Sequence, residues 1–141
     1  MKTLLRAMTA ATLLASATIG PALAQIDTGL DFTTSFPFYA QNTKMPAGSY
    51  TATSVDFDSN TVRIESADGK YSAFIDFVPT HAEQAHKQTD VTFHRYGNVE
   101  YLNRLWVDGQ RYGMKVEPTK AEKKVAASAS PVEHSVSGKR H

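Results

Sequence analysis

The chain contains no cysteine among its 141 residues. Disulfide bonds, cysteine-ligated zinc and thiol catalysis are therefore excluded. A domain of this length without disulfides has to be stabilised by apolar packing and by backbone hydrogen bonds in its helices or strands.

Sequence motifs of the common enzyme classes are also missing. The chain has no G-x-S-x-G nucleophile elbow, no H-E-x-x-H zinc motif, no glycine-rich phosphate loop and no dinucleotide-binding fingerprint. No pair of carboxylates stands out as a general acid and base, because most of the aspartates lie in or beside predicted turns. These absences favour a protein that is not an enzyme, and we expect no cofactor.

Long hydrophobic runs are scarce, and the clearest one lies at the N-terminus. The apolar stretch Ala7 to Ile19 follows Lys2 and Arg6, and Ala22-Leu23-Ala24 fits the small-x-small cleavage rule. The stretch is too short for a stable transmembrane helix. We therefore predict that residues 1–24 are a secretory signal peptide cleaved after Ala24. The mature protein would be periplasmic or secreted, with no transmembrane segment.

Charge of one sign is also limited, since the formal net charge is only +1. Nucleic-acid binding usually requires a strong basic stripe, so we expect no nucleic-acid partner. The basic residues are densest in residues 115–141, where a solvated tail explains them.

The part after residue 24 consists of short runs in which apolar and polar residues alternate, separated by turn residues. This period of two is typical of antiparallel strands. It predicts strands over residues 32–38, 49–57, 61–67, 70–78, 91–96 and 99–107, and a less regular strand over 111–116. We predict a single all-β domain over residues 25–117, built as a small antiparallel barrel or sandwich of about six or seven strands.

Residues 118–141 are predicted to contain a short helix and a disordered basic tail. Thr119 and Glu122 have the Thr-x-x-Glu spacing of a capping box, which predicts a helix over residues 120–127. Residues 128–141 have too few apolar side chains to form a packed core, so we expect them to be disordered.

The sequence FHRYGNVEYLNRLW, from Phe93 to Trp106, predicts a β-hairpin. Gly97-Asn98 fits a two-residue type II′ turn, in which the glycine adopts a positive φ. The facing pairs would be Tyr96–Val99, Arg95–Glu100, His94–Tyr101 and Phe93–Leu102. His94 and Arg95 would then lie on opposite faces, which argues against a shared catalytic role. The face with His94 has fewer charges, so we expect it to face the core.

Two sets of residues are candidates for binding. Four aromatic side chains are candidates for lining a small-molecule pocket at a barrel mouth, namely Tyr71, Tyr96, Tyr101 and Trp106. Packing in the core explains these aromatic residues equally well. Three histidines are candidate metal ligands, namely His81, His86 and His94. They could bind a metal only if the polar loop over residues 79–90 brings them together. The alternative interpretation is that they are solvent-exposed loop histidines.

Three classes of function stay open. The first is an exported, non-enzymatic protein that binds a small apolar ligand or associates with the cell envelope. The second is a small periplasmic hydrolase or metal-dependent enzyme that uses the region of His81, His86 and His94. The third is a structural partner in an envelope complex. The sequence does not identify the partner.

Several short segments resemble a family of small exported bacterial proteins of unknown function. The segments are Lys44-Met45-Pro46-Ala47-Gly48-Ser49-Tyr50-Thr51, Ser66-Ala67-Asp68-Gly69, Phe93-His94-Arg95-Tyr96-Gly97 and Leu105-Trp106. The similarity spans roughly residues 32–117, and Met45 stands where the family pattern has leucine. The resemblance implies a compact β domain behind a signal peptide. It implies no activity and no functional residues.

Overall fold

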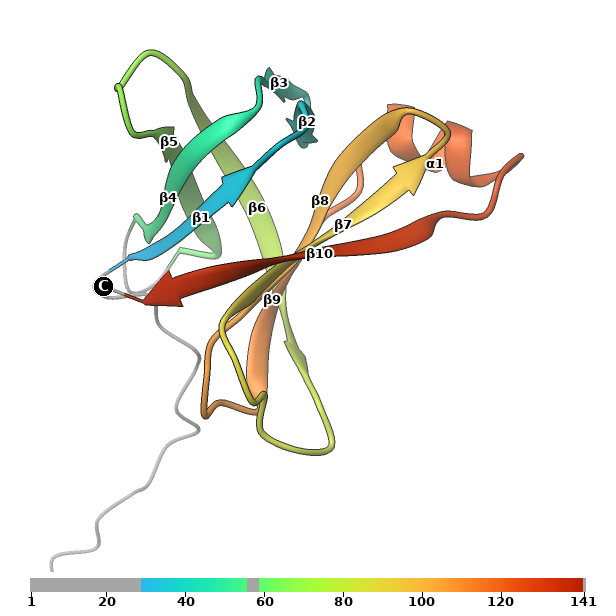
Figure 1. Ribbon diagram of the computed structural model, residues 1–141. Coiled ribbons are helices and arrows are strands. Elements are labelled where there is room, and N and C mark those ends of the chain that lie inside the picture. The colour runs from blue at the N-terminus through green and yellow to red at the C-terminus, as the bar shows by residue number, and fades with distance from the viewer. Residues whose placement is uncertain (1–28, 56–58, 141) are drawn as a thin grey trace, which may run out of the picture.

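The computed structural model describes residues 29–55 and 59–140 (Figure 1). The predicted signal peptide over residues 1–24 lies outside these ranges. The strands are β1 (Leu30–Thr34), β2 (Phe38–Ala40), β3 (Thr43–Met45), β4 (Gly48–Ser54), β5 (Thr61–Ser66), β6 (Ser72–His81), β7 (Asp90–Tyr96), β8 (Val99–Trp106), β9 (Tyr112–Val116) and β10 (Val132–Arg140). The helix α1 covers Lys120–Ala126.

Eight of these strands form a closed antiparallel barrel, in the order β1-β4-β5-β6-β9-β8-β7-β10, and β10 pairs back onto β1. The predicted all-β class is confirmed, but the barrel has more strands than the six or seven expected. Strands β7 to β10 lie in the spatial order β10-β7-β8-β9, which is a Greek key, and α1 lies in its long connection.

The interior of the barrel is filled by side chains that alternate along the strands. On β5 and β6 the inward positions include Val62, Ile64, Ala73 and Ile75, which alternate with more exposed residues. The rings of Phe32, Phe38, Tyr50 and Phe93 pack against one another at one end, with centroid distances between 5.2 and 6.5 Å. The interior is therefore a packed core.

The strand predicted over residues 32–38 is split into two strands. β1 ends at Thr34, Ser35 and Phe36 bend, and β2 starts at Phe38. Pro37 lacks a backbone N–H and cannot continue the ladder, which explains the break. β2 and β3 form a small hairpin outside the barrel ladder, where β2 pairs in parallel with β8 at Tyr39 and Tyr101. The predicted strand over residues 49–57 appears as β4, and residues 56–58 lie outside the described ranges.

The register of the hairpin between β7 and β8 is confirmed, but its predicted core face is wrong. All four expected pairs are present, and Gly97 has a φ of 62°. However, the register shifts at Asn103, which lies opposite no residue of β7. This bulge brings Leu105 onto the same face as Phe93 and Leu102, and that face is the buried one. His94 lies on the outer face.

The predicted disorder of residues 128–141 is also wrong, because most of this tail forms β10. β10 pairs with β1 on one side and with β7 on the other (Figure 1). Backbone hydrogen bonds to both β1 and β7 stabilise β10, although few of its side chains are apolar. Gly138 also allows a close approach, since a Cβ there would lie 3.2 Å from the carbonyl oxygen of Asp31. The predicted helix is present as α1, and Thr119 Oγ1 accepts a hydrogen bond from the backbone N–H of Glu122.

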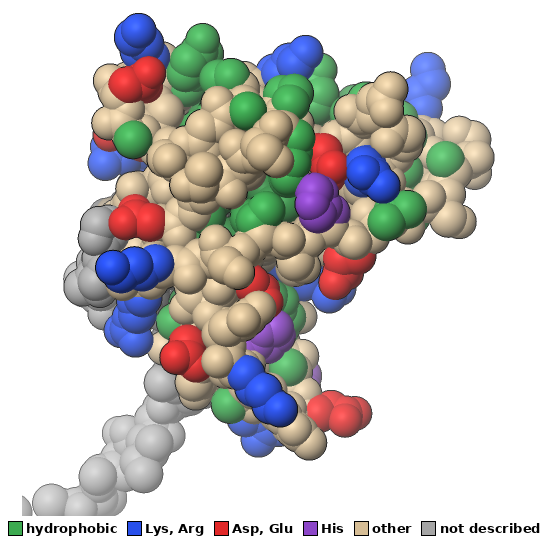
Figure 2. All heavy atoms as spheres, in the orientation of Figure 1, with side chains coloured by type: hydrophobic (Ala, Val, Ile, Leu, Met, Phe, Trp, Pro, Cys, Tyr) green, Lys and Arg blue, Asp and Glu red, His purple; other side chains and the backbone are tan. Residues whose placement is uncertain are grey.

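Among the described residues, no helix has the length and apolar character needed to cross a bilayer. On the face of the molecule shown in Figure 2, basic and acidic side chains are interspersed, and neither sign dominates.

Candidate functional site

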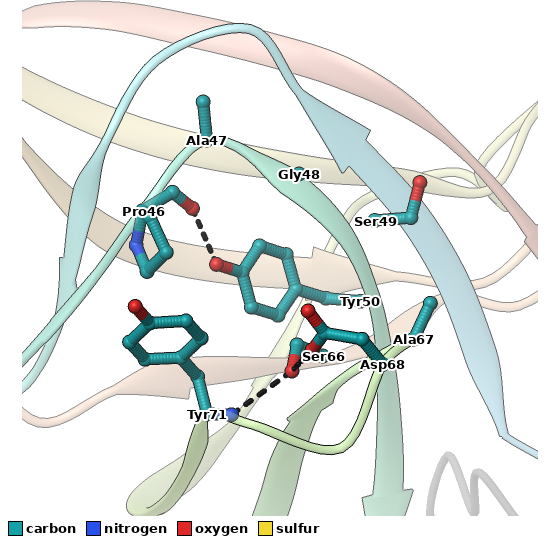
Figure 3. Close-up of a pocket in the computed structure, with 9 residues that line it drawn as sticks. All are labelled: Pro46, Ala47, Gly48, Ser49, Tyr50, Ser66, Ala67, Asp68 and Tyr71. Atoms are coloured by element: carbon teal, nitrogen blue, oxygen red, sulfur yellow. Dashed lines mark hydrogen bonds between the residues drawn. The ribbon is translucent and has the colours of Figure 1, made fainter.

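A pocket of about 270 Å³ lies where the segment leading into β4 meets the turn between β5 and β6 (Figure 3). It is lined by Pro46, Ala47, Gly48, Ser49, Tyr50, Ser66, Ala67, Asp68 and Tyr71. The two segments are brought together by the pairing of β4 with β5, which places Tyr50 opposite Ser66. The backbone N–H of Ala67 extends this contact by donating to the carbonyl of Ser49 at 2.9 Å.

The turn that forms one wall is fixed by its own hydrogen bonds. Asp68 Oδ1 accepts from Ser66 Oγ at 2.7 Å and from the backbone N–H of Lys70 at 3.0 Å. Ser66 Oγ in turn accepts from the backbone N–H of Tyr71 at 3.0 Å. Gly69 adopts a φ of 73°, which a residue with a side chain disfavours. The Asp68-Gly69 turn thus sets the position of the Asp68 carboxylate and of Tyr71.

The two tyrosines of the pocket have different roles. Tyr50 is buried, its ring stacks on Phe32 at 5.7 Å, and its hydroxyl donates to the carbonyl of Pro46 (Figure 3). Burial raises the pKa of Tyr50, with smaller contributions from Tyr71 and Asp68. The ring of Tyr71 is 44% exposed and lies on the same side of the pocket as Pro46 (Figure 3). One wall is therefore rigidly attached to the core, and the other is accessible to a ligand.

Asp68 is the one charged side chain among the nine lining residues. The hydrogen bond from Ser66, followed by that from Lys70, lowers the pKa of the Asp68 carboxyl group. At neutral pH the group is therefore an ionised carboxylate and a weak proton acceptor. The arrangement is suited to binding through charge and aromatic contact, and it is poorly suited to acid–base catalysis.

The four aromatic candidates do not share one site. Tyr71 lines the pocket, whereas Tyr96 and Tyr101 are buried on the outer face of the β7–β8 hairpin, with ring centroids 5.9 Å apart. Burial raises the pKa of both tyrosines, and the nearby Glu122 raises it further. Trp106 stacks on His86 at 4.1 Å with an interplanar angle of 8°.

The three histidines do not form a metal-binding group in the part of the chain that the structure describes. His81 lies at the end of β6 opposite Tyr112, and His94 lies on the outer face of β7. His86 Nδ1 is 3.8 Å from Asp90 Oδ2. Burial lowers the pKa of His94, which favours its neutral form. Within residues 29–55 and 59–140, no three His, Cys, Asp or Glu side chains are grouped so as to hold a metal ion.

Sequence reasoning missed a polar pair on β8 and β10. Glu100 Oε1 lies 3.1 Å from His134 Nδ1, and the ring of Phe36 lies 4.6 Å from that of His134. Glu100 is only 5% exposed, and its Oε2 atom is buried without a hydrogen-bond partner among the described residues. His134, Val136 and Gly138 alternate with more exposed positions along β10, but only Val136 among them is apolar, so the sequence carries a weak signal for this strand.

Most of the pocket was also missed. Only Tyr71 was a candidate, because Pro46, Tyr50 and Asp68 lie in separate turn and strand segments that come together through the β4–β5 pairing. Both segments belong to the runs that carry the resemblance to the family of exported proteins, which implies no functional residues.

Comparison of the chain with family models, with curated proteins and with solved structures gives no match. The resemblance to a family of small exported bacterial proteins therefore stays a prediction.

Proposed function

We propose that this protein is an exported, non-enzymatic β-barrel that binds a small molecule in the pocket between Tyr50 and Tyr71. The observation that carries the proposal is the pocket itself, which combines the exposed ring of Tyr71 with a turn held by the hydrogen bonds of Ser66 and Asp68. Ligand pockets typically combine apolar or aromatic walls with a few fixed polar groups. This small pocket has both features, an aromatic wall at Tyr71 and fixed polar groups at Ser66 and Asp68.

The position of the pocket fits the packing of the barrel. The phenyl rings of Phe32, Phe38 and Phe93 fill one end of the interior, so a ligand is better accommodated at the rim. The neighbouring backbone is held by the β4–β5 ladder, so little ordering is required when a ligand binds.

The metal-dependent alternative has less support than binding. Among the described residues, the histidines on which it relies, His81, His86 and His94, are not part of any group of three potential metal ligands. The proposal of export rests on the sequence of residues 1–24, with its basic start, apolar run and small-x-small site.

A fragment screen by two-dimensional NMR on the processed chain tests the proposal. We expect small aromatic or amine fragments to shift the amide signals of Tyr50, Ser66 and Asp68 in a saturable way. Tyr71→Ala should abolish these shifts. Tyr112→Ala removes a similarly exposed tyrosine on β9 and should leave them intact. Fragments that bind elsewhere, or shifts that survive Tyr71→Ala, would argue against this pocket.

A further inference from the structure

The lining of the pocket carries a single charge, and that charge is negative. Asp68 supplies it, and no lysine, arginine or histidine is among the nine described lining residues. Both hydrogen bonds to this carboxylate go to Oδ1. Among the described residues, no hydrogen bond to Oδ2 is recorded, so that oxygen can accept one from a ligand.

The basic residues nearby do not neutralise the pocket. Lys70 lies two residues after Asp68, and its backbone N–H donates to the carboxylate. The positive charge of Lys70 also lowers the pKa of Asp68, but less than the hydrogen bonds from Ser66 and Lys70 do. The guanidinium of Arg63 lies 3.8 Å from Glu65, on a neighbouring part of β5. Since neither a lysine nor an arginine is among the described residues that line the pocket, the Asp68 carboxylate is the charge that a bound ligand would meet, and it repels anions and attracts cations.

The aromatic rings of the pocket also favour a cationic ligand. Tyr50 and Tyr71 both line the pocket, and the ring of Tyr71 is largely accessible. The face of an aromatic ring carries negative charge density and attracts ammonium groups. A carboxylate beside two tyrosine rings is thus a combination that favours an organic cation over a neutral or acidic molecule.

We infer that the pocket binds a small organic cation, such as an amine or a methylated ammonium, between Tyr71 and the Asp68 carboxylate. This inference rests on the proposed function, since it names the ligand class of the same site. The volume of about 270 Å³ suits a molecule with few heavy atoms. The ammonium would contact the ring of Tyr71, and an N–H or a hydroxyl of the ligand would donate to Asp68.

The test compares two probes of nearly equal shape, choline and dimethylbutanol, in which a carbon replaces the charged nitrogen. Both are titrated into the processed chain and followed by the amide signals of Ser66, Asp68 and Tyr71. We expect choline to bind more tightly. Added salt should weaken choline binding and leave dimethylbutanol binding unchanged.

Two variants separate the charge from the rings. Asp68→Asn keeps an oxygen for Ser66 and Lys70 but removes the charge, and Tyr71→Leu keeps bulk but removes the ring. We expect each to weaken choline binding roughly two- to fivefold. Asp68→Asn should weaken choline binding more than dimethylbutanol binding, because both probes keep the hydroxyl that donates to Asp68 and only choline carries the charge. Asp76→Asn, at an exposed aspartate on β6 outside the pocket, is the matched control.

The outcomes distinguish the inference from the proposed function. If both probes bind equally and Asp68→Asn has no effect, the cationic class is overturned while the binding pocket stands. If neither probe nor any fragment binds saturably, both are overturned. Choline binding that depends on Asp68 and Tyr71 supports both.

Discussion

Glu122 is a carboxyl group whose surroundings oppose its ionisation. It is 8% exposed, and it is the buried residue of α1. Burial raises its pKa above the ordinary value for glutamate. The backbone N–H of Glu122 donates to Thr119 Oγ1 at the helix cap, so the Glu122 side chain can be changed without removing that hydrogen bond.

We expect Glu122→Gln to stabilise the protein at neutral pH. Because the pKa of Glu122 is raised in the folded state, the folded protein retains a proton at pH values where the unfolded chain has lost it. The stability of the parent therefore falls as the pH rises from the unfolded pKa through the folded pKa. The variant lacks this loss, so its melting temperature should exceed that of the parent at pH 7.

The difference should shrink toward acidic pH, where the parent carboxyl is protonated. Thermal unfolding followed by circular dichroism over a pH series measures it. Glu117→Gln, at an exposed position before the helix, is the control and should show no such pH-dependent gain. A constant offset between Glu122→Gln and the parent at every pH would contradict the expectation.

Gly113 is required because β9 approaches Trp106 closely. A Cβ at this position would lie 2.5 Å from the Trp106 ring and 2.9 Å from the carbonyl oxygen of Leu105. Neither the buried ring nor the backbone can move freely, so Gly113→Ala should lower the free energy of unfolding by about 1–3 kcal/mol.

Chemical denaturation followed by the fluorescence of the single tryptophan measures this loss. Lys115→Ala, at an exposed position on the same strand, should change stability by less than about 0.5 kcal/mol. Equal effects of the two substitutions would show that the close contact with Trp106 is not the cause.

Strand β10 closes the barrel, because it pairs with both β1 and β7. A chain ending at Ser130 would leave both of those strands as open edges. We expect this truncated chain to lose cooperative unfolding and to aggregate, whereas a chain ending at Arg140 should behave as the parent. Denaturation and size-exclusion chromatography measure both properties. Parent-like cooperative unfolding of the truncated chain would contradict the role of β10.

The contact between His134 and Glu100 links β10 to β8 across the intervening β7. Because His134 is 37% exposed, solvent weakens the interaction. A double-mutant cycle with His134→Gln and Glu100→Gln should give a coupling energy of roughly 0.5–1.5 kcal/mol. Thr92→Ser on β7, which leaves both partners in place, should show no coupling with His134→Gln. Additive single effects would exclude a contribution of the contact to stability.

The elements that the sequence predicted well are those specified by local chemistry. Gly97-Asn98 predicted the register of the β7–β8 hairpin, and Thr119 with Glu122 predicted the start of α1. The bulge at Asn103 had no such local signal, so the core face of the hairpin was assigned wrongly. β10 was missed because Val136 is the one apolar residue among its partly buried positions, and because the strand is stabilised by partners distant in sequence.

Closure of the barrel and the position of the pocket depend on contacts between distant segments. Alternation of apolar and polar residues within each strand is the same in a barrel and in a sandwich. The pairing of β10 with β1 and of β6 with β9 is what makes this fold a barrel. The pocket depends likewise on the β4–β5 register, which brings Tyr50 beside the Asp68 turn. Composition and periodicity therefore predict the class of the fold, and long-range pairing decides where a ligand can bind.

Export concerns the whole chain, and it can be tested separately from binding. The full-length chain with a C-terminal tag, expressed in a Gram-negative host, should appear in the periplasmic fraction with Gln25 as its first residue. Mass spectrometry of the intact protein measures the processing. Replacing Ala22 and Ala24 together by leucine should block cleavage, because the peptidase requires small side chains at these positions. Ala11→Leu, within the apolar run, keeps the cleavage site and should be processed normally. An uncleaved product that stays in the cytoplasm would remove the basis for placing the ligand outside the inner membrane.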